Sequence, residues 1–326
     1  MSRFRWGILA TGSIAATLAE ALKMSDEAEI LAVASRTQKS AEAFGERWDI
    51  PRRYASYADL AQDPDVDVIY IATPHNLHYE NMLMCLEAGK HVLCEKPLTL
   101  NARQAAECIA LARQKGLFLM EAMWMRFFPS IAQVQAWIQA GEIGAIRMLS
   151  ADFCVDIPYH PAGRLYNPEL GGGALLDLGI YPLSLATLLL GFPQQIDGHA
   201  TLGATGVDEL VSFTMQYEDG ALAHLSCSSR VHKPVEAFIA GMDGYIKIHE
   251  HFFYPDRLTL HKKDQEAQEV HIPYRGNGYI YEVEEVHACL KAGRGESAVM
   301  PLDDTYKQMQ LMDTLRAQWG LRYPGE

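Results

Sequence analysis

The chain has 326 residues, and its 28 Lys plus Arg against 41 Asp plus Glu give a formal net charge of −13. This length suggests about two domains, and 49% hydrophobic with 21% charged residues is typical of a globular protein, which excludes a disordered chain, collagen and a small disulfide-framed protein. The acidic excess disfavours nucleic acid and anionic membrane surfaces as partners.

The first 120 residues alternate short β-branched runs with helical patterns, which is typical of βαβ units around a parallel sheet. In chain order we predict strand 4–9, helix 13–24, strand 30–34, helix 39–48, strand 66–72, helix 76–88, strand 91–94, helix 101–115 and strand 118–120. Residues 1–120 are therefore expected to form an α/β domain of their own.

The pattern changes after residue 120, where helix 131–140 and strand 146–155 precede the apolar stretch 174–192 and then several strands in succession. The stretch approaches the length that spans a membrane, but it contains Asp177, and we predict a buried helix. Two Asp-Gly pairs, at 219–220 and 243–244, mark hairpins.

Residues 121–326 are thus expected to form an α+β domain with an open, mainly antiparallel sheet. We predict an amphipathic C-terminal helix at 303–319, and its packing against the first domain is left open as an alternative.

The amino-terminal residues hold too short an apolar run for a signal sequence, and the six scattered cysteines form no Cys-x-x-Cys pair. We therefore predict a cytoplasmic protein without a cysteine redox motif. The histidine pairs 75/78 and 249/251 lack further ligands at a known zinc spacing, so we predict no metal.

The first predicted strand leads into Ala10, Thr11, Gly12, Ser13 and Ile14, at the place of a Gly-x-Gly-x-x-Gly/Ala dinucleotide-binding fingerprint. Gly12 would let the backbone approach a pyrophosphate, and the following helix would supply N–H groups and a positive dipole. Ala10 stands where the fingerprint has its first glycine, which leaves a plain tight turn as the alternative.

The second predicted strand is followed by Ser35, Arg36 and Thr37, where NAD-binding proteins have an acidic residue for the ribose 2′-hydroxyl. A hydroxyl and a guanidinium at this place favour the 2′-phosphate of NADP over NAD, although NAD is not excluded. The alternative is a solvated arginine at the start of a helix.

Polar residues also follow the third and fourth predicted strands, namely Thr73, Pro74 and His78 after the third, and Glu95 and Lys96 after the fourth. Ligands of open α/β sheets bind beyond the carboxyl ends of the strands, so these residues are candidates for a ligand site. His78 has a simpler alternative, because it also stands at the start of a predicted helix.

Further along, three glycines at 171–173 precede the apolar helix, whose Asp177 and Tyr181 are four residues apart and therefore on one face. Together with the Gly-Lys-His-Val-x-x-Glu-Lys-Pro run at 89–97, this segment resembles the Gfo/Idh/MocA oxidoreductase family over essentially the whole chain. The tyrosine at 181 and the segment 121–129 are most similar to the branch of dimeric dihydrodiol dehydrogenases and glucose-fructose oxidoreductases.

The resemblance implies an NAD(P)-binding Rossmann domain, a second domain whose open sheet often forms a dimer interface, and hence a homodimer. It also implies that Lys96 lies beside the nicotinamide and the substrate hydroxyl, with Thr73 and Pro74 beside the cofactor and His78 near the nicotinamide pocket. The expected cofactor-binding residues are Ala10, Thr11, Gly12, Ser13, Ile14, Ser35, Arg36, Thr37, Thr73, Pro74, His78, Glu95 and Lys96.

The three residues that the resemblance marks as catalytic also make chemical sense. Hydride transfer from a carbinol carbon requires a base for the hydroxyl proton. Tyr181 titrates too high by itself, but a nearby ammonium such as Lys96 would stabilise its phenolate. Asp177 would bind a second substrate hydroxyl or pair with Lys96.

Three alternatives remain open for these residues. Lys96 itself could carry the proton while Tyr181 positions the substrate. Tyr181 could be a packed aromatic side chain, or Lys96 a surface loop lysine.

Trp124, Arg126, Phe128 and Arg164 are expected to contact the substrate, with packing between the domains as the alternative for the first three. The sequence therefore predicts an NADP-dependent oxidoreductase that acts on a cyclic polyol, a sugar or a trans-dihydrodiol. The second hypothesis is a non-catalytic nucleotide-binding sensor or regulatory protein of the same fold.

Overall fold

The computed structural model describes residues 3–326, which form two compact units. Unit one comprises the described residues up to Trp124 together with Arg275–Tyr306, and unit two comprises Met125–Tyr274 and Lys307–Glu326. The expected boundary at residue 120 lies close to this division, but residues 275–306, which were expected in the second domain, belong to unit one.

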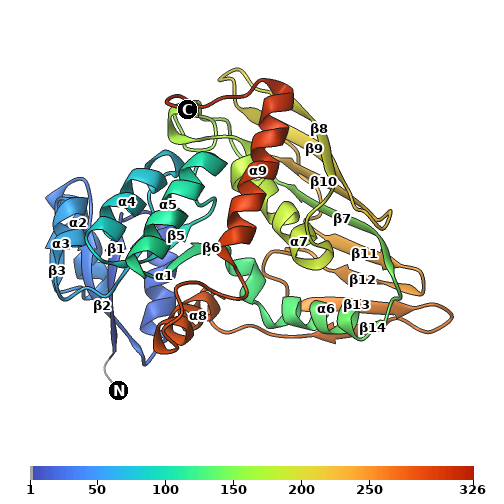
Figure 1. Cartoon of the computed structure of the whole chain (residues 1–326), viewed down its shortest axis with the longest axis horizontal. Helices are drawn as coiled ribbons and strands as arrows, with labels where there is room; N and C mark the ends of the chain where they lie inside the picture. Colours follow the sequence, from blue (N-terminus) through green and yellow to red (C-terminus); the bar gives the residue numbers. More distant parts are fainter. Residues whose placement is uncertain (1–2) are drawn as a thin grey trace. The chain divides into compact units, whose positions relative to one another are not determined.

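Unit one is built on a parallel six-stranded sheet in the order β3-β2-β1-β4-β5-β6 (Figure 1). The strands are β1 (Phe4–Leu9), β2 (Ala28–Ala34), β3 (Arg52–Tyr54), β4 (Val68–Ile71), β5 (His91–Glu95) and β6 (Leu119–Ala122). The helices are α1 (Ser13–Lys23), α2 (Gln38–Trp48), α3 (Tyr57–Gln62), the 3-10 helix η1 (His75–Leu77), α4 (His78–Glu87), α5 (Ala102–Lys115) and α8 (Ile280–Lys291).

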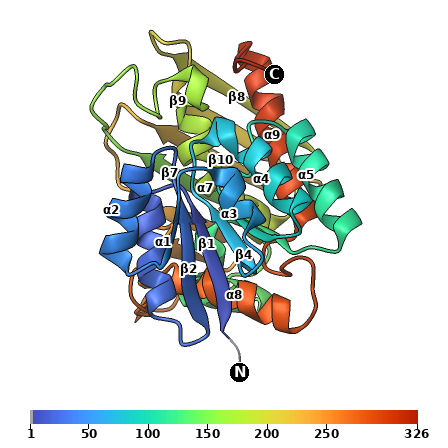
Figure 2. The ribbon, with the colours of Figure 1, turned by 90° about the vertical axis from the view of Figure 1, so that its left-hand side faces the viewer.

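This strand order is that of a Rossmann domain, so the expected fold of the first half is confirmed. The strands read as continuous apolar runs because helices cover both faces of the sheet. Figure 2 shows α1 and α2 on one side of the strands and α4 and α5 on the other. The short elements β3 and α3 were not predicted, and neither was α8, which packs against α1.

Unit two is built on an eight-stranded sheet in the order β14-β13-β12-β11-β7-β10-β9-β8. The strands are β7 (Ile146–Cys154), β8 (Gln195–Leu202), β9 (Asp208–Gln216), β10 (Leu222–Ser228), β11 (Ala237–Gly241), β12 (Gly244–Ile248), β13 (Arg257–Lys262) and β14 (Gln268–His271). The helices are η2 (Trp124–Phe127), α6 (Pro129–Gln139), η3 (Pro168–Leu170), the π-helical turn η4 (Leu175–Gly179), α7 (Ile180–Leu190) and α9 (Leu302–Trp319), of which η2 and α9 begin in unit one.

The sheet of unit two is mainly antiparallel, as expected, with one parallel pair, β7 and β10. Helix α7 packs against these two strands. The segment Pro168–Leu190 is long and apolar enough to cross a membrane, but 83% of its most apolar window is buried inside the structure. The prediction of a buried helix is therefore confirmed.

One buried histidine of unit one makes the stability of the fold sensitive to acid. His287 of α8 stacks on Phe4, with ring centroids 4.7 Å apart, and its Nε2 accepts a hydrogen bond of 3.0 Å from Trp6 Nε1. The residue is only 1% exposed, and burial lowers the pKa of His287 to about 4. The folded chain therefore holds this ring neutral.

Because the pKa is lower in the folded chain, the stabilisation is complete above pH 6.5, the ordinary histidine value, and is lost as the pH falls toward 4. We expect the free energy of unfolding to fall by about 2–3 kcal/mol from this group between pH 7 and pH 4.5. His287→Gln retains an acceptor for Trp6 but does not titrate. Urea unfolding at both pH values should show a smaller loss for the variant, and equal losses would contradict the prediction.

Candidate active site

The turn after β1 has the backbone that a dinucleotide fingerprint requires. Ala10 takes φ of 95°, a left-handed conformation that favours glycine, at the position of the first fingerprint glycine. Gly12 is the N-cap of α1 in an extended conformation, without any side-chain cap. A Cβ added to Gly12 would meet no atom within 4 Å. The open N-terminus of α1 therefore leaves room for a pyrophosphate, and Ala10 takes the backbone conformation that the first fingerprint glycine would have.

The three residues after β2 differ in whether their side chains form hydrogen bonds or ion pairs with the rest of the protein. Ser35 Oγ lies 3.2 Å from Thr11 Oγ1, which links this strand end to the turn after β1. Thr37 is the N-cap of α2 and accepts a hydrogen bond of 3.2 Å from Ser40 N. Arg36 is exposed and makes no ion pair with any group in residues 3–326. Its guanidinium is therefore available for an anionic ligand.

The loops after β4 and β5 are held together by His78. This buried ring places Nδ1 at 2.8 Å from the carbonyl oxygen of Pro97 and Nε2 at 2.9 Å from that of Thr73. Desolvation lowers the pKa of His78. From β6, Glu121 accepts a hydrogen bond of 2.9 Å from Leu98 N. His78 thus positions the loop that carries Lys96, and its direct contact with a cofactor stays a prediction.

Glu95, which precedes Lys96, has a phenol and a second carboxyl group as buried neighbours. Glu95 is buried at the end of β5 and accepts a hydrogen bond from Tyr70 of β4. Glu282 of α8 is fully buried, and neither of its carboxylate oxygens has a hydrogen-bond partner in residues 3–326. Burial, and then the charge of Glu95, raises the pKa of Glu282 well above its usual range. The neutral form of Glu282 is therefore favoured at this buried position.

Tyr181 lies at the start of α7, directly after the π-helical turn η4 that contains Asp177. The residue is 5% exposed, and its ring packs beside two phenylalanines that stack on each other, with centroids 5.3 Å from Phe153 and 5.2 Å from Phe253. Turns of π-helix are rare and occur often at functional sites. The phenol of Tyr181 thus lies next to a π-helical turn and packs against a pair of stacked aromatic rings.

Asp177 is buried and paired with an arginine from the preceding loop. Its Oδ1 accepts a hydrogen bond of 2.8 Å from Arg164, whose side chain is 59% exposed. Sequence considerations left Asp177 with a choice between a substrate hydroxyl and Lys96, and the structure adds this third partner. Asp177, Arg164 and Tyr181 belong to unit two, whereas Lys96 belongs to unit one.

The expected substrate wall also makes packing contacts inside each unit. Trp124 stacks on Tyr279 with ring centroids 4.2 Å apart in unit one. In unit two, the Arg126 side chain is buried and donates to Ser184 Oγ of α7 at 3.0 Å, while the ring of Phe128 packs against Tyr274. Arg126 therefore anchors the helix that carries Tyr181, and contact of these three side chains with a substrate stays a prediction.

Sequence considerations missed Phe153, Phe253 and Glu282. The aromatic run 252–254 is a signal for Phe253, whereas nothing in the local sequence distinguishes Phe153 or Glu282. In residues 3–326 no group of three or more His, Cys, Asp or Glu side chains is arranged to hold a metal ion.

Comparisons with known proteins agree along the whole chain. Residues 4–123 match the model described as "Oxidoreductase family, NAD-binding Rossmann fold", and residues 131–247 match the Gfo/Idh/MocA C-terminal domain. Trans-1,2-dihydrobenzene-1,2-diol dehydrogenase of Xenopus tropicalis is 37% identical over 98% of this chain and 99% of that protein. The protein of that name from Mus musculus is 36% identical over 98% of each chain.

Among solved structures, a 3-ketoreductase from Actinomadura kijaniata in complex with NADP and TDP-benzene is similar, with a TM-score of 0.89 and 28% identity. The similarity covers 97% of this chain and 98% of that one. The same ketoreductase has also been solved with one lysine replaced and with one tyrosine replaced.

Proposed function

Because the chain belongs to the Gfo/Idh/MocA family of oxidoreductases, we propose that it transfers hydride between NADP and a carbinol carbon of a cyclic polyol, a sugar or a trans-dihydrodiol. The observation that carries the proposal is the turn after β1, where the uncapped N-terminus of α1 and the open face of Gly12 leave room for a pyrophosphate in a chain of this family.

The fit of unit one to NADP extends over three strand ends. The turn 10–14 would hold the pyrophosphate, and Arg36 with Ser35 would bind the 2′-phosphate. This role suits Arg36 because its guanidinium makes no ion pair within residues 3–326. Thr73 and Pro74 would border the nicotinamide half. NAD would bind more weakly because it leaves Arg36 without its anion.

The bound nicotinamide supplies the hydride acceptor or donor, and the chain supplies the proton. We assign Tyr181 Oη as the group that takes the hydroxyl proton during oxidation and returns it during reduction. Lys96 Nζ is assigned to stabilise the negative charge on oxygen in both directions. Asp177 would accept a hydrogen bond from a second substrate hydroxyl, with Arg164 holding its carboxylate in place.

Two features support a ring-shaped diol or sugar as substrate. The relatives at 36–37% identity are named for a dihydrodiol of benzene. The stacked pair Phe153 and Phe253 packs beside Tyr181, and an aromatic surface of this kind is suited to contact with the carbon skeleton of a ring. A vicinal diol would place one hydroxyl at Tyr181 and the next at Asp177.

The test is turnover measured by the absorbance of reduced nicotinamide across a panel of trans-dihydrodiols, cyclic polyols and aldoses, with NADP and with NAD. We expect turnover of at least one class, faster with NADP at low cofactor concentration. Tight binding of NADP, seen as a change in nicotinamide fluorescence, without turnover of any compound would overturn the proposal in favour of a nucleotide-binding sensor.

We also propose a homodimer formed through the open face of the unit-two sheet. Met148 of β7, Leu222 of β10 and Phe238 of β11 are 53%, 48% and 38% exposed on three adjacent strands, and Leu222 is in register with Met148. An exposed apolar surface of this kind is typical of a protein interface. Light scattering should give twice the chain mass, and Met148→Glu with Leu222→Glu should give the single mass.

The expected cytoplasmic location also stays a proposal. It is supported by the six cysteines, which are all buried and free.

A further inference from the structure

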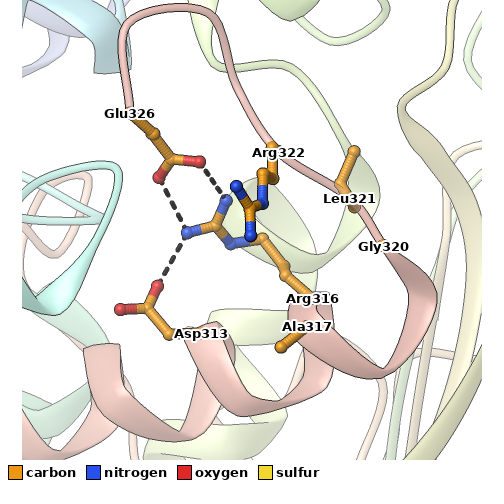
Figure 3. Close-up of a pocket in the computed structure, with 7 residues that line it drawn as sticks. All are labelled: Asp313, Arg316, Ala317, Gly320, Leu321, Arg322 and Glu326. Atoms are coloured by element: carbon orange, nitrogen blue, oxygen red, sulfur yellow. Dashed lines mark hydrogen bonds and ion pairs between the residues drawn. The ribbon is translucent and has the colours of Figure 1, made fainter.

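Residues 320–326 follow α9 and bend back on its end, and we call this segment the hook. Leu321 N donates to the carbonyl oxygen of Arg316, and Gly320 takes a positive φ of 68° where the helix ends. Arg316 then donates to both carboxylate oxygens of Glu326, at 2.8 and 2.9 Å, and to Asp313 at 2.7 Å (Figure 3). The hook is therefore closed by a bidentate ion pair on a buried arginine.

Tyr323 lies inside this hook. Its backbone N–H donates to Glu326 Oε2 at 2.8 Å, and its ring lies 5.0 Å from the Arg316 guanidinium. The side chain is 3% exposed, and its hydroxyl donates to the carbonyl oxygen of Gly172 at 2.5 Å. The carboxyl terminus thus reaches the glycine loop 171–173.

Asp208, the first residue of β9, holds the other end of the same loop. Its Oδ2 accepts a hydrogen bond of 2.6 Å from Leu175 N, the first residue of η4. Gly173 takes φ of 125°, and a Cβ there would lie 2.3 Å from Asp208 Oδ1 and 3.0 Å from Tyr323 Oη. Only glycine fits between these two side chains.

The loop that is held in this way carries the residues assigned to the substrate. Gly173 N donates to the carbonyl oxygen of Leu165 at 2.8 Å, which ties the glycines to the loop of Arg164. Arg164 in turn holds Asp177, and Tyr181 follows within one helical turn. A displacement of the glycines would therefore move all three side chains.

We propose that Tyr323 and Asp208 are positioning residues for the active site, and that the hook of residues 320–326 sets the placement of Asp177, Arg164 and Tyr181. The inference rests on the proposed function of these three side chains. It adds to that function a segment that begins 130 residues (320 − 190) beyond the end of α7, the helix that carries Tyr181.

Tyr323→Phe removes one hydroxyl and leaves the buried ring in place. Tyr217→Phe is the matched control, because the Tyr217 hydroxyl is buried in the same unit without a hydrogen-bond partner in residues 3–326. We expect kcat to fall about 5- to 20-fold in Tyr323→Phe, as for the loss of one buried hydrogen bond. The affinity for NADP, measured by nicotinamide fluorescence, should be unchanged.

Hydrogen exchange of the backbone in residues 171–181 supplies a readout without substrate or cofactor. It should become faster in Tyr323→Phe and stay at the parent rate in Tyr217→Phe. Parent exchange in Tyr323→Phe, or faster exchange with an unchanged kcat, would overturn the proposal. If no compound of the panel is turned over, the proposed function fails, while the exchange measurement still tests the hook.

The Asp208 variants give an independent test should Tyr323→Phe not fold. Asp208 Oδ2 accepts its hydrogen bond from Leu175 N, and burial raises the pKa of Asp208 to about 7, which favours the neutral form more than at an exposed site. Asp208→Asn keeps an acceptor for Leu175 N and should stay within about 3-fold of the parent kcat, whereas Asp208→Ala should fall about 10- to 50-fold. Equal activities of the two variants would contradict the positioning role.

Discussion

Tyr181→Phe is expected to lower kcat by a factor of about 100 to 10,000, the usual contribution of a positioned acid/base group. The phenylalanine ring keeps the packing against Phe153 and Phe253 but has no atom that can exchange a proton with the substrate oxygen. Tyr159→Phe is the control, because Tyr159 is 45% exposed in the loop before the glycines.

Lys96→Met separates the two assignments of the proton. If Tyr181 carries the proton, Tyr181→Phe abolishes the rise of kcat/KM with pH in the oxidative direction, whereas Lys96→Met moves that rise to higher pH because the phenolate loses its ammonium. If Lys96 carries the proton, Lys96→Met abolishes this rise, whereas Tyr181→Phe weakens substrate positioning and leaves the pH at which kcat/KM rises unchanged. A Tyr181→Phe enzyme with parent kcat and parent pH dependence would remove the assignment.

Arg36→Ala is expected to weaken NADP binding by a factor of about 10 to 100, which corresponds to the loss of charge-assisted hydrogen bonds to a phosphate. Binding of NAD should change by less than about 3-fold, because NAD lacks the phosphate that the guanidinium would contact. The dissociation constants of both cofactors are measured by nicotinamide or tryptophan fluorescence.

Arg47→Ala controls for the change in charge. Arg47 is exposed like Arg36, but it lies at the far end of α2 with its guanidinium over the ring of Trp48. It should leave both cofactors unaffected. Equal losses for NADP and NAD in Arg36→Ala would refute a role in binding the 2′-phosphate, and a salt-insensitive affinity for NADP in the parent would contradict it as well.

The acidic composition makes the local cation at Arg36 more important than it would be in a basic protein. With a net charge of −13, the field of the whole chain repels a dinucleotide phosphate. In the proposed function, the N-terminus of α1 and the guanidinium of Arg36 would oppose this repulsion locally. The affinity for NADP should therefore rise as moderate salt screens the long-range repulsion. It should fall again at higher salt, when the contacts between the phosphates and the local positive groups are screened as well.

Much of unit one was readable from the sequence because its signals are local. A buried parallel strand is a short apolar run, and the turn after it is marked by Gly12 within a few residues. Among the elements of unit one that escaped prediction, β3 and α3 have three and six residues, which are too few to show a period. Ala10 is instructive as well, since its positive φ is imposed by the turn and not by the residue type.

The candidate site was readable in part for the same reason. The motifs around Lys96 and Tyr181 are contiguous in the sequence, so the residues themselves identify them. The residues that surround these motifs are not contiguous with them. Glu282 lies 187 residues beyond Glu95 in the chain, and the charge of Glu95 affects the pKa of Glu282 only because α8 packs in unit one. Burial without a partner is a property of the packed interior and has no pattern in the sequence.

The sequence by itself determined most strands and helices of the first half, the buried apolar helix of the second half and the place of the turn after β1, and it supplied the candidates for moving a proton. Only the tertiary structure decided that residues 275–306 belong to unit one, that β7 and β10 pair in parallel, and that Tyr323 and Asp208 clamp the glycine loop. The reason is that hydrophobic period and turn chemistry act over a few residues, whereas these pairings join segments separated by tens to hundreds of residues and depend on how the whole core packs.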